Sequence, residues 1–505
     1  MKHLTLVCSM LIACAAAQAQ SPLADLIQDG QRAAALRALD ARDVDVNAAQ
    51  GDGTTPLHWA VYKIDRELVA ELLEHGAKAD VTNKYGSSPL AEAVKLADLE
   101  LVRQLLDAGA NVESPNGDGQ TALMLAAHIG ALDIARVLVE HGADVNAKEA
   151  WRDQTALMWA VDGNYPELSQ FLIDQGADVN ARASANDWDS QITSEPRAQY
   201  RPVGGLTAVL YAARSGCTRC VRSLLAAGAD ADLPTPEGMT PLMIAIDNQR
   251  YDTARLLLDE GANPHVWDWY GRTALYVAVD MSTFRGRQSH PATSSETSAN
   301  DMVRLLLEAG VNPNAQLNMH RPSRGGNIGR FADEMLTTGT TPLLRATMGG
   351  DVDTVRLLLE HGALVDLPNV QGVTPLMAAA GHVSGRNRQF DPVEAEARAV
   401  ELLELFLAAG ADVNAKLPNE YSLSARVGRQ PSALTEREGQ TALYGAVKFG
   451  WTNVVEYLLA NGADANVKDA HGKTPLDSAL GGSGGRDNTP SEAIAARLRA
   501  ATTSR

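Results

Sequence analysis

Apolar residues recur along the chain in pairs that are four positions apart. Leu68-Val69 and Leu72-Leu73 are one example, and this spacing places all four on one face of a helix. Gly76 follows them, where a glycine in the left-handed conformation would end the helix. Upstream, Thr55-Pro56 supplies an N-cap hydroxyl and a proline suited to the first helical position, so an earlier helix starts there. The pattern predicts two short helices followed by a turn over Asp80–Gly86.

This unit of two helices and a turn repeats along the chain. Segments of the type Thr-Pro-Leu or Thr-Ala-Leu open the copies, and segments of the type Leu-Leu-x-x-Gly-Ala close them. In the first copies two sets of anchors recur every 33 residues: the leucines Leu57, Leu90 and Leu123, and the glycines Gly76, Gly109 and Gly142. A fixed period of this length indicates stacked repeats, in which each unit buries its apolar face against its neighbours.

The repeat motifs resemble those of a known family. The 33-residue period, the T-P-L-H segment Thr55–His58, the G-A-D-V-N segment Gly142–Asn146 and the paired helices together resemble the ankyrin-repeat family over about residues 40–480. The resemblance implies an all-α repeat solenoid of about eleven ankyrin-like helix-turn-helix units. Hairpin-like fingers would project between the units and, with the first or inner helices, form a concave face.

The expected domain boundaries follow from the extent of the repeats. We expect the array to form a single elongated domain whose end units are polar caps. Its parts would be a signal peptide at 1–19, an N-terminal capping repeat at 20–50, the ankyrin-repeat solenoid at 51–480 and a C-terminal cap at 481–505.

Three fingers are longer than the others by the same amount. The distance from a glycine anchor to the next leucine anchor is 14 residues for Gly76 and Leu90, but 33 residues in three later copies. Insertions in solenoids lie in loops and often mark the binding face, so these segments are predicted to contribute to binding. The long fingers lie at about 182–204, 316–338 and 416–438, and two insertions at about 281–300 and 381–396 lengthen the loop between paired helices.

Composition and charge narrow the classes of function. Aromatic residues make up 5% of the chain and apolar residues 45%, so the core is predicted to consist of alanine, leucine and valine in closely packed helices. The formal net charge of −18 and the pI near 5.1 would repel a phosphate backbone. We therefore expect no general binding to nucleic acid.

The first twenty residues have the features of a secretory leader. Lys2 precedes an apolar run over Leu4–Ala17, and Ala17–Ala19 has the small-residue pattern of a cleavage site. Leu11–Cys14 also resembles a bacterial lipobox, in which Cys14 would carry a lipid. Simple cleavage is favoured over lipidation, and both remain open. No later segment has the ~18 apolar residues of a membrane span, so the expected product is exported, periplasmic or secreted, or alternatively a membrane-anchored lipoprotein.

Sequence motifs for catalysis, metal binding or cofactor binding are scarce. Gly325–Arg330 lacks the Lys-Ser/Thr of a phosphate-binding loop. Cys217 and Cys220 form the one CxxC; a buried structural role is favoured, and a local disulfide is the alternative. Because a second CxxC is missing, a zinc site is not predicted. We therefore expect no enzyme activity, no metal and no cofactor.

Aromatic and arginine residues at the expected binding surface are the candidate anchors, since such side chains bury much area at modest entropic cost. The resemblance implies contact through finger tips and through residues just after the inner helices. The tip candidates are Tyr85, Trp151, Arg152, Trp269 and Tyr270, and those after inner helices are Tyr62, His128, Ile129, Lys448 and Phe449. The long-finger candidates are Trp188, Arg201, Arg321, Arg324, Arg330, Arg426 and Arg429.

Together these features predict a non-catalytic, exported, monomeric scaffold that binds a protein of unknown identity through the concave face and long fingers. Two alternatives stay open. One is a small-ligand-binding protein or enzyme with a site between the long fingers. The other is an exported effector that acts in another cell.

Overall fold

The computed structural model describes residues 22–42, 44–186, 203–283, 295–318, 338–381, 392–418, 437–481 and 491–503. These residues form two compact units. Unit 1 comprises the described residues up to Asn186 together with Val203–Asp230, and unit 2 comprises the described residues from Ala231 onward. The predicted leader, including Cys14, lies outside the described residues.

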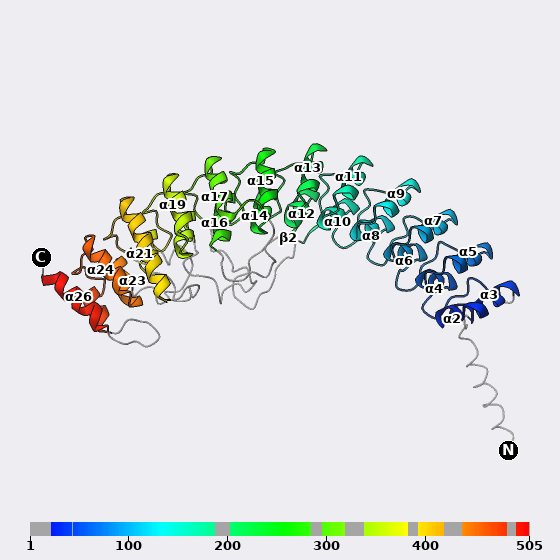
Figure 1. Ribbon diagram of the computed structural model, residues 1–505, viewed down its shortest axis with the longest axis horizontal. Helices are drawn as coiled ribbons and strands as arrows, with labels where there is room; N and C mark the ends of the chain where they lie inside the picture. The colour runs from blue at the N-terminus through cyan, green and yellow to red at the C-terminus, as the bar shows by residue number, and fades with distance from the viewer. Residues whose placement is uncertain are drawn as a thin grey trace, which may run out of the picture. The chain divides into compact units, whose positions relative to one another are not determined.

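Unit 1 is built from pairs of short helices, coloured blue to green in Figure 1. The first, inner helix of each pair packs on the inner helices of the neighbouring pairs, and the second, outer helices pack on one another. The unit is therefore two rows of helices deep. Its pairs are α2 (Pro22–Gln28) and α3 (Arg32–Asp40), α4 (Pro56–Tyr62) and α5 (Arg66–Glu74), α6 (Pro89–Lys95) and α7 (Leu99–Asp107), α8 (Ala122–Ile129) and α9 (Leu132–Glu140), α10 (Ala156–Asp162) and α11 (Pro166–Asp174), and α12 (Ala208–Ser215) and α13 (Thr218–Ala226).

Unit 2 has the same construction, coloured green to red in Figure 1. Inner helices again contact inner helices, and outer helices contact outer helices. Its pairs are α14 (Pro241–Asp247) and α15 (Tyr251–Asp259), α16 (Ala274–Ser282) and α17 (Ala299–Glu308), α18 (Pro342–Met348) and α19 (Val352–Glu360), α20 (Pro375–Ala379) and α21 (Pro392–Ala408), α23 (Ala442–Phe449) and α24 (Thr452–Ala460), and α25 (Pro475–Leu480) and α26 (Glu492–Thr503). Helices at both predicted caps, α2 with α3 and α26, are thus present.

The helix boundaries follow from local chemistry, as the motifs predicted. The Thr55 hydroxyl accepts a hydrogen bond from the His58 N–H at 3.5 Å and so caps α4. Gly76 ends the pair with φ +88°, and the following Ala77 N–H donates to the Leu72 carbonyl at 2.9 Å. A residue with a side chain would be strained at that φ, which explains the glycine anchor.

The asparagine of the G-A-D-V-N motif joins each repeat to the next repeat along the chain. The Asn146 side chain donates to the Gly176 carbonyl at 3.0 Å and accepts from the Asp178 N–H at 2.7 Å. One side chain therefore satisfies both a donor and an acceptor at the end of the next outer helix. The residues that make the same two bonds are Asn47, Asn180, Asn314 and Asn414.

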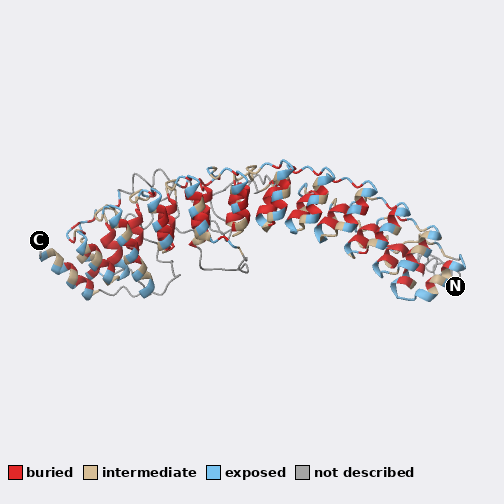
Figure 2. Cartoon of the chain, turned by 45° about the horizontal axis from the view of Figure 1, so that its top comes forward, coloured by how far each residue is buried: buried red, intermediate tan, exposed pale blue. Residues whose placement is uncertain are grey.

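The core lies between the two rows of helices. Figure 2 shows the buried residues gathered within the helix pairs and the exposed residues along helix ends and connecting segments. Alanines on the inner helices let the helices approach closely, while leucines fill the space between rows; Ala60, Ala160, Leu72 and Leu105 are fully buried examples. Each fully buried leucine contributes roughly 1.5–3 kcal/mol relative to exposure, so the repeated leucines hold the stack together.

The three long fingers share one kind of base. In the first, β1 (Ala185–Asn186) pairs antiparallel with β2 (Val203–Gly204). In the second, the Leu317 N–H donates to the Thr340 carbonyl at 3.1 Å and the Gly339 N–H donates back at 2.8 Å, and Leu417 makes the corresponding bonds in the third. Leu317 and Leu417 are buried, so each base is anchored in the helix stack.

The insertions between paired helices are shorter than predicted. Helix α16 continues to Ser282 and α17 begins at Ala299, so the predicted loop over 281–300 overlaps both. Helix α21 begins at Pro392 and runs for 17 residues, although its first turn was expected in a loop. Proline suits a first helical position, and the i, i+4 pair of Glu394 with Arg398 at 2.9 Å supports the extra turn. Within the described residues, no helix is long and apolar enough to cross a membrane.

Candidate functional site

One short finger of unit 1 presents a tryptophan to solvent. The carboxylate of buried Glu149 accepts hydrogen bonds from the N–H groups of Trp151 and Arg152, each at 2.7 Å, and from Gln154 at 3.2 Å. Asp153 closes the turn with φ +53°, where the other short fingers have glycine. The backbone of this tip is therefore fixed, while the Trp151 side chain is 75% exposed. A rigid exposed aromatic residue of this kind is a common interface anchor.

A groove lies beside this finger, against the inner helices α8, α10 and α12. We call it the inner groove. Its volume is about 460 Å³, and the residues that matter for its chemistry are His128, Arg152, Gln154, Trp159, Tyr211 and Arg214.

Aromatic rings form much of the inner groove. The His128 and Trp159 rings meet edge to face, with centroids 4.7 Å apart. The Trp159 Nε1 is buried without a hydrogen-bond partner. Gln154 Nε2 donates to the Tyr211 hydroxyl at 2.5 Å, and burial raises the pKa of Tyr211, so the phenol keeps its proton at neutral pH.

Two arginines, Arg214 and Arg152, line the same groove, and their guanidinium groups differ in the contacts that they make. Arg214 forms an ion pair with Asp162 at 2.7 Å, and its guanidinium lies 4.9 Å from the centroid of the Tyr211 ring. The Arg152 guanidinium makes no hydrogen bond or ion pair within the described part of the chain. The Arg152 carbonyl accepts from the Ser184 N–H at 2.7 Å, which ties this tip to the next finger. Arg152 is thus a positioned cation that remains available.

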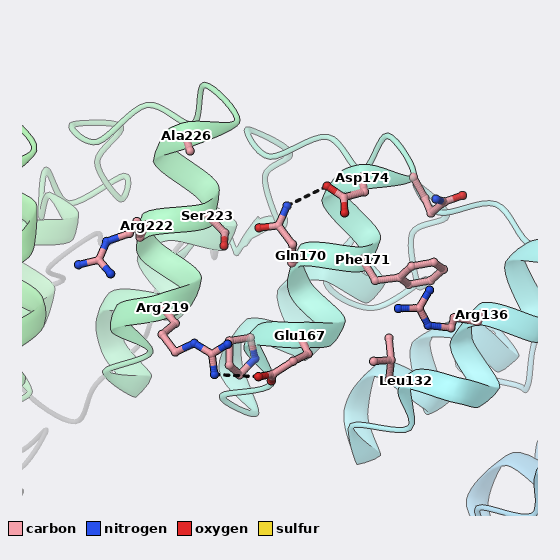
Figure 3. A pocket seen from close by; sticks show the side chains of 12 residues that line it. Leu132, Arg136, Glu167, Gln170, Phe171, Asp174, Arg219, Arg222, Ser223 and Ala226 are labelled. Atoms are coloured by element: carbon pink, nitrogen blue, oxygen red, sulfur yellow. Dashed lines mark hydrogen bonds and ion pairs between the residues drawn. The ribbon is translucent and has the colours of Figure 1, made fainter.

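A second hollow of about 680 Å³ lies on the outer helices α9, α11 and α13, as Figure 3 shows. Its two carboxylates, Glu167 and Asp174, both have side-chain partners. Arg219 pairs with Glu167 at 2.7 Å, and Arg136 lies 4.7 Å from the centroid of the Phe171 ring. Arg222 points away from the helix α11 in Figure 3. We take the inner groove as the better candidate site, because it combines aromatic rings with the fixed finger tip of Trp151 and Arg152.

The other exposed candidates lie apart from the inner groove. Tyr62 on α4 is exposed and meets Trp59 edge to face at 5.7 Å. Tyr85 is exposed at its finger tip. Trp269 is 53% exposed in unit 2, and Trp267, from the same Trp-Asp-Trp-Tyr run, is also exposed.

Tyr270 departs from the prediction that it is an exposed anchor, because it is only 6% exposed. Its N–H donates to the buried Asp268 carboxylate at 3.0 Å, and its carbonyl accepts from the Asn318 N–H at 2.8 Å. Its ring centroid lies 5.6 Å from the Arg272 guanidinium. Tyr270 therefore supports the finger rather than forming its surface.

Several predicted site residues lie outside the described residues, so their roles remain predictions, as does a ligand site between the long fingers. They are Trp188, Arg201, Arg321, Arg324, Arg330, Arg426 and Arg429, together with Cys14.

Cys217 and Cys220 are joined by a disulfide, and both are buried. The Cys217 sulfur also accepts from the Cys220 N–H at 3.2 Å and takes the N-cap position of α13. The burial of both cysteines fits the favoured prediction of a structural role, and the disulfide between them fits the alternative prediction of a local disulfide. Among the described residues, no group of three or more His, Cys, Asp or Glu side chains is arranged to hold a metal ion.

Of the six residues named for the inner groove, sequence reasoning missed four: Gln154, Trp159, Tyr211 and Arg214. A signal was available in the repeat register. Arg214 lies seven residues after the N-cap Thr207, as the predicted His128 lies seven after Thr121. Aligning every copy on its N-cap threonine would have identified Arg214.

Comparison with known proteins agrees with these features. Models of ankyrin repeats in three copies match residues 12–116, 91–183, 191–268, 209–317 and 290–417, and a model of ankyrin repeats in many copies matches residues 429–479. The B-cell lymphoma 3 protein homolog of Mus musculus is 29% identical over 238 residues, which are 47% of this chain and 39% of that protein. The human ankyrin repeat and SOCS box protein 16 is 30% identical over 188 residues, 35% of this chain and 41% of that protein.

The chain spans less than half the length of these curated relatives. Among solved structures, the human ASB11 ankyrin repeat domain matches with a TM-score of 0.39 and 21% identity, over 48% of this chain and 100% of that domain. The family models cover most of the chain, including both units. The chain therefore belongs to the ankyrin-repeat family.

Proposed function

We propose that this chain is a non-catalytic scaffold that binds another protein through the inner groove and the adjoining finger tips of unit 1. Ankyrin repeats are in general protein–protein interaction modules, which supports the class of function. The observation that carries the proposal is the fixed tip at Trp151 and Arg152, which presents an exposed tryptophan beside an aromatic groove and an arginine whose guanidinium has no ion pair among the described residues. Tryptophan, tyrosine and arginine are the residues most often found as interface anchors.

We further propose that the scaffold acts after export, in the periplasm or outside the cell. The leader-like segment 1–19 supports this, with either cleavage after Ala19 or lipidation at Cys14. The disulfide between Cys217 and Cys220 is also typical of an oxidising compartment. Mass measurement of the N-terminal peptide of the chain purified from its own cells distinguishes these fates, and an intact Met1 would contradict export.

The binding proposal is tested by photo-crosslinking in the cells that make the chain. Benzoylphenylalanine replaces Trp151 at the rim of the inner groove or, as the control, Arg222 on the outer helices of the same unit. We expect a protein adduct from position 151 and none of the same mass from position 222. Equal adducts from both positions, or none from position 151, would contradict the proposal.

A further inference from the structure

We propose that the inner groove recognises an acidic peptide segment of the partner. In this arrangement a carboxylate of the peptide meets Arg152 and the Tyr211 hydroxyl, and a neighbouring apolar side chain packs on Trp159. The inference rests on the proposed function, because it names the chemistry of the partner at the same site.

The available hydrogen-bonding groups of the inner groove are predominantly donors. The guanidinium of Arg152 carries five N–H donors and no acceptor. The Tyr211 oxygen already accepts from Gln154, which leaves the phenol proton as a donor. The Trp159 Nε1 is a further donor, and it has no partner among the described residues. Because buried donors gain most from an ionised acceptor, a carboxylate complements this set better than a lysine, an arginine or an amide N–H.

The charge of the inner groove favours the same ligand. Its lining carries the cations Arg152 and Arg214, and its one carboxylate, Asp162, is already paired with Arg214. The lining is thus positive by one charge, whereas the chain as a whole carries −18. An acidic peptide would be steered to this local positive site, while a long polyanion such as nucleic acid would meet the acidic surface around it.

The size of the inner groove suits a short segment rather than a whole domain. Its volume of about 460 Å³ lies within the range of pockets that enclose drug-sized groups, so it has room for a few side chains. Trp159 and its neighbour His128 give an apolar surface on which a leucine or an aromatic side chain can pack.

The first test selects peptides without assuming a sequence. A random peptide library displayed on phage is panned on the full chain, and each clone is then assayed on the variants Arg152→Ala and Arg222→Ala. Arg222→Ala is the matched control, because it removes an arginine from the outer helices of the same unit. We expect the clones that lose binding on Arg152→Ala, but not on Arg222→Ala, to be enriched in Asp and Glu beside an apolar residue.

The second test measures the contribution of charge directly. A selected peptide, labelled with fluorescein, is compared with its Glu→Gln counterpart by fluorescence anisotropy. We expect about tenfold weaker binding for the Gln peptide and for Arg152→Ala, since hydrogen bonds to charged groups are about this strong. Asp162→Asn should instead tighten binding several-fold, because it removes the one negative charge from the lining of the groove. Damage to the fold would weaken binding in both variants, so tighter binding by Asp162→Asn would show that charge recognition is being measured.

Each contrary outcome has a defined meaning. The inference is overturned if no clone depends on Arg152, if the dependent clones are not acidic, if the Gln peptide binds equally well, or if a single-stranded oligonucleotide displaces the peptide from the groove. If crosslinking from position 151 still yields a protein adduct, the proposed function stands and only the acidic chemistry is wrong. If that adduct is also missing, the proposed function fails as well.

Discussion

Two arginine–aspartate pairs, one in each unit, join successive inner helices but lie in opposite environments. In unit 1, Arg214 on α12 pairs with Asp162 on α10 at 2.7 Å, and the two side chains are 43% and 45% exposed. In unit 2, Arg345 on α18 pairs with Asp280 on α16 at 2.6 Å, and the side chains are 11% and 8% exposed. Asp162 and Asp280 both lie seven residues after the threonine that caps their helix. The same repeat position is therefore surface in one unit and interior in the other.

Neighbouring residues explain this difference. In unit 1 the position seven residues after the cap is exposed in every inner helix from α4 to α12; its occupants are Tyr62, Lys95, His128, Asp162 and Arg214. In the middle of unit 2 the occupants are buried; they are Asp280, Met348 and Gly381. A Cβ on Gly381 would lie 2.8 Å from the Phe449 ring, so the glycine lets the next inner helix close over this position. The repeat motif thus sets the helix, and at Gly381 the lack of a side chain lets the next inner helix cover its surface.

The largest predicted effect comes from breaking the buried pair. Arg345→Ala breaks an ion pair whose two side chains are almost fully buried and should destabilise unit 2 by about 3–5 kcal/mol. Arg214→Ala breaks the exposed pair and should change unit 1 by less than about 1 kcal/mol. Hydrogen exchange of amides in α16 and α18, compared with those in α10 and α12, measures both. Equal losses of stability in the two units would contradict the predicted difference between the buried and the exposed ion pair.

A smaller effect is expected from two glycines at one repeat position, Gly349 in unit 2 and Gly163 in unit 1. A Cβ on Gly349 would overlap the buried Thr283, whereas one on Gly163 would meet the half-exposed ring of Tyr165. Gly349→Ala should therefore cost about 1–3 kcal/mol of stability, and Gly163→Ala less, because the tyrosine can move toward solvent. Urea unfolding of the two variants, followed by hydrogen exchange of α18 and α10, gives the comparison. A larger loss for Gly163→Ala would mean that the interior of unit 2 adapts more readily.

Acid should weaken the packing around a buried histidine of unit 1. His58 Nδ1 accepts from the Thr55 N–H at 3.2 Å and Nε2 donates to the Ser87 carbonyl at 3.0 Å, and burial lowers the pKa of His58 below its ordinary value of 6.5. The unfolded chain therefore binds the proton more readily, so stability is retained above pH 6.5 and declines as pH falls below it.

Thermal unfolding of the α4 and α6 region between pH 7.5 and 5 tests this direction. His58→Gln should lower stability at pH 7.5 but flatten the decline in acid. His128→Gln, at the exposed position of α8, is the matched control and should leave the decline in place. If His58→Gln keeps the full decline, another group is responsible.

The fold could be predicted because its determinants are local. The Thr55 cap, the left-handed Gly76 and the apolar pairs each act within a few residues, so the helix pairs followed directly from the motifs. The equal length of the three fingers was also evident in the sequence, but the hydrogen bonds of Leu317 and Leu417 at the bases of two of them were not. The hydrogen bonds of Asn146 to the next repeat could not be derived in this way, because they depend on how two repeats stack.

The candidate site could be predicted only in part. Trp151 and Arg152 were found because they lie at a finger tip, and both are exposed there. Tyr270 was wrongly expected at the surface, since its burial depends on the following finger through Asn318. Arg214 was missed although it lies at the same repeat position as the predicted His128, seven residues after the N-cap threonine, because the copies were not compared at that position.

The smallest effect on stability, and the sharpest test of the open surface, is expected from Trp151→Ala. The turn is held by Glu149 through backbone N–H groups, and the indole is 75% exposed, so removing it should change stability by less than about 0.5 kcal/mol. Binding of the selected acidic peptide should nevertheless fall, because an anchor next to Arg152 is lost. Differential scanning calorimetry and anisotropy on the same preparation measure both quantities. A loss of more than about 1 kcal/mol would show that the indole supports the fold, and the surface of unit 1 would then be less open than its contrast with unit 2 implies.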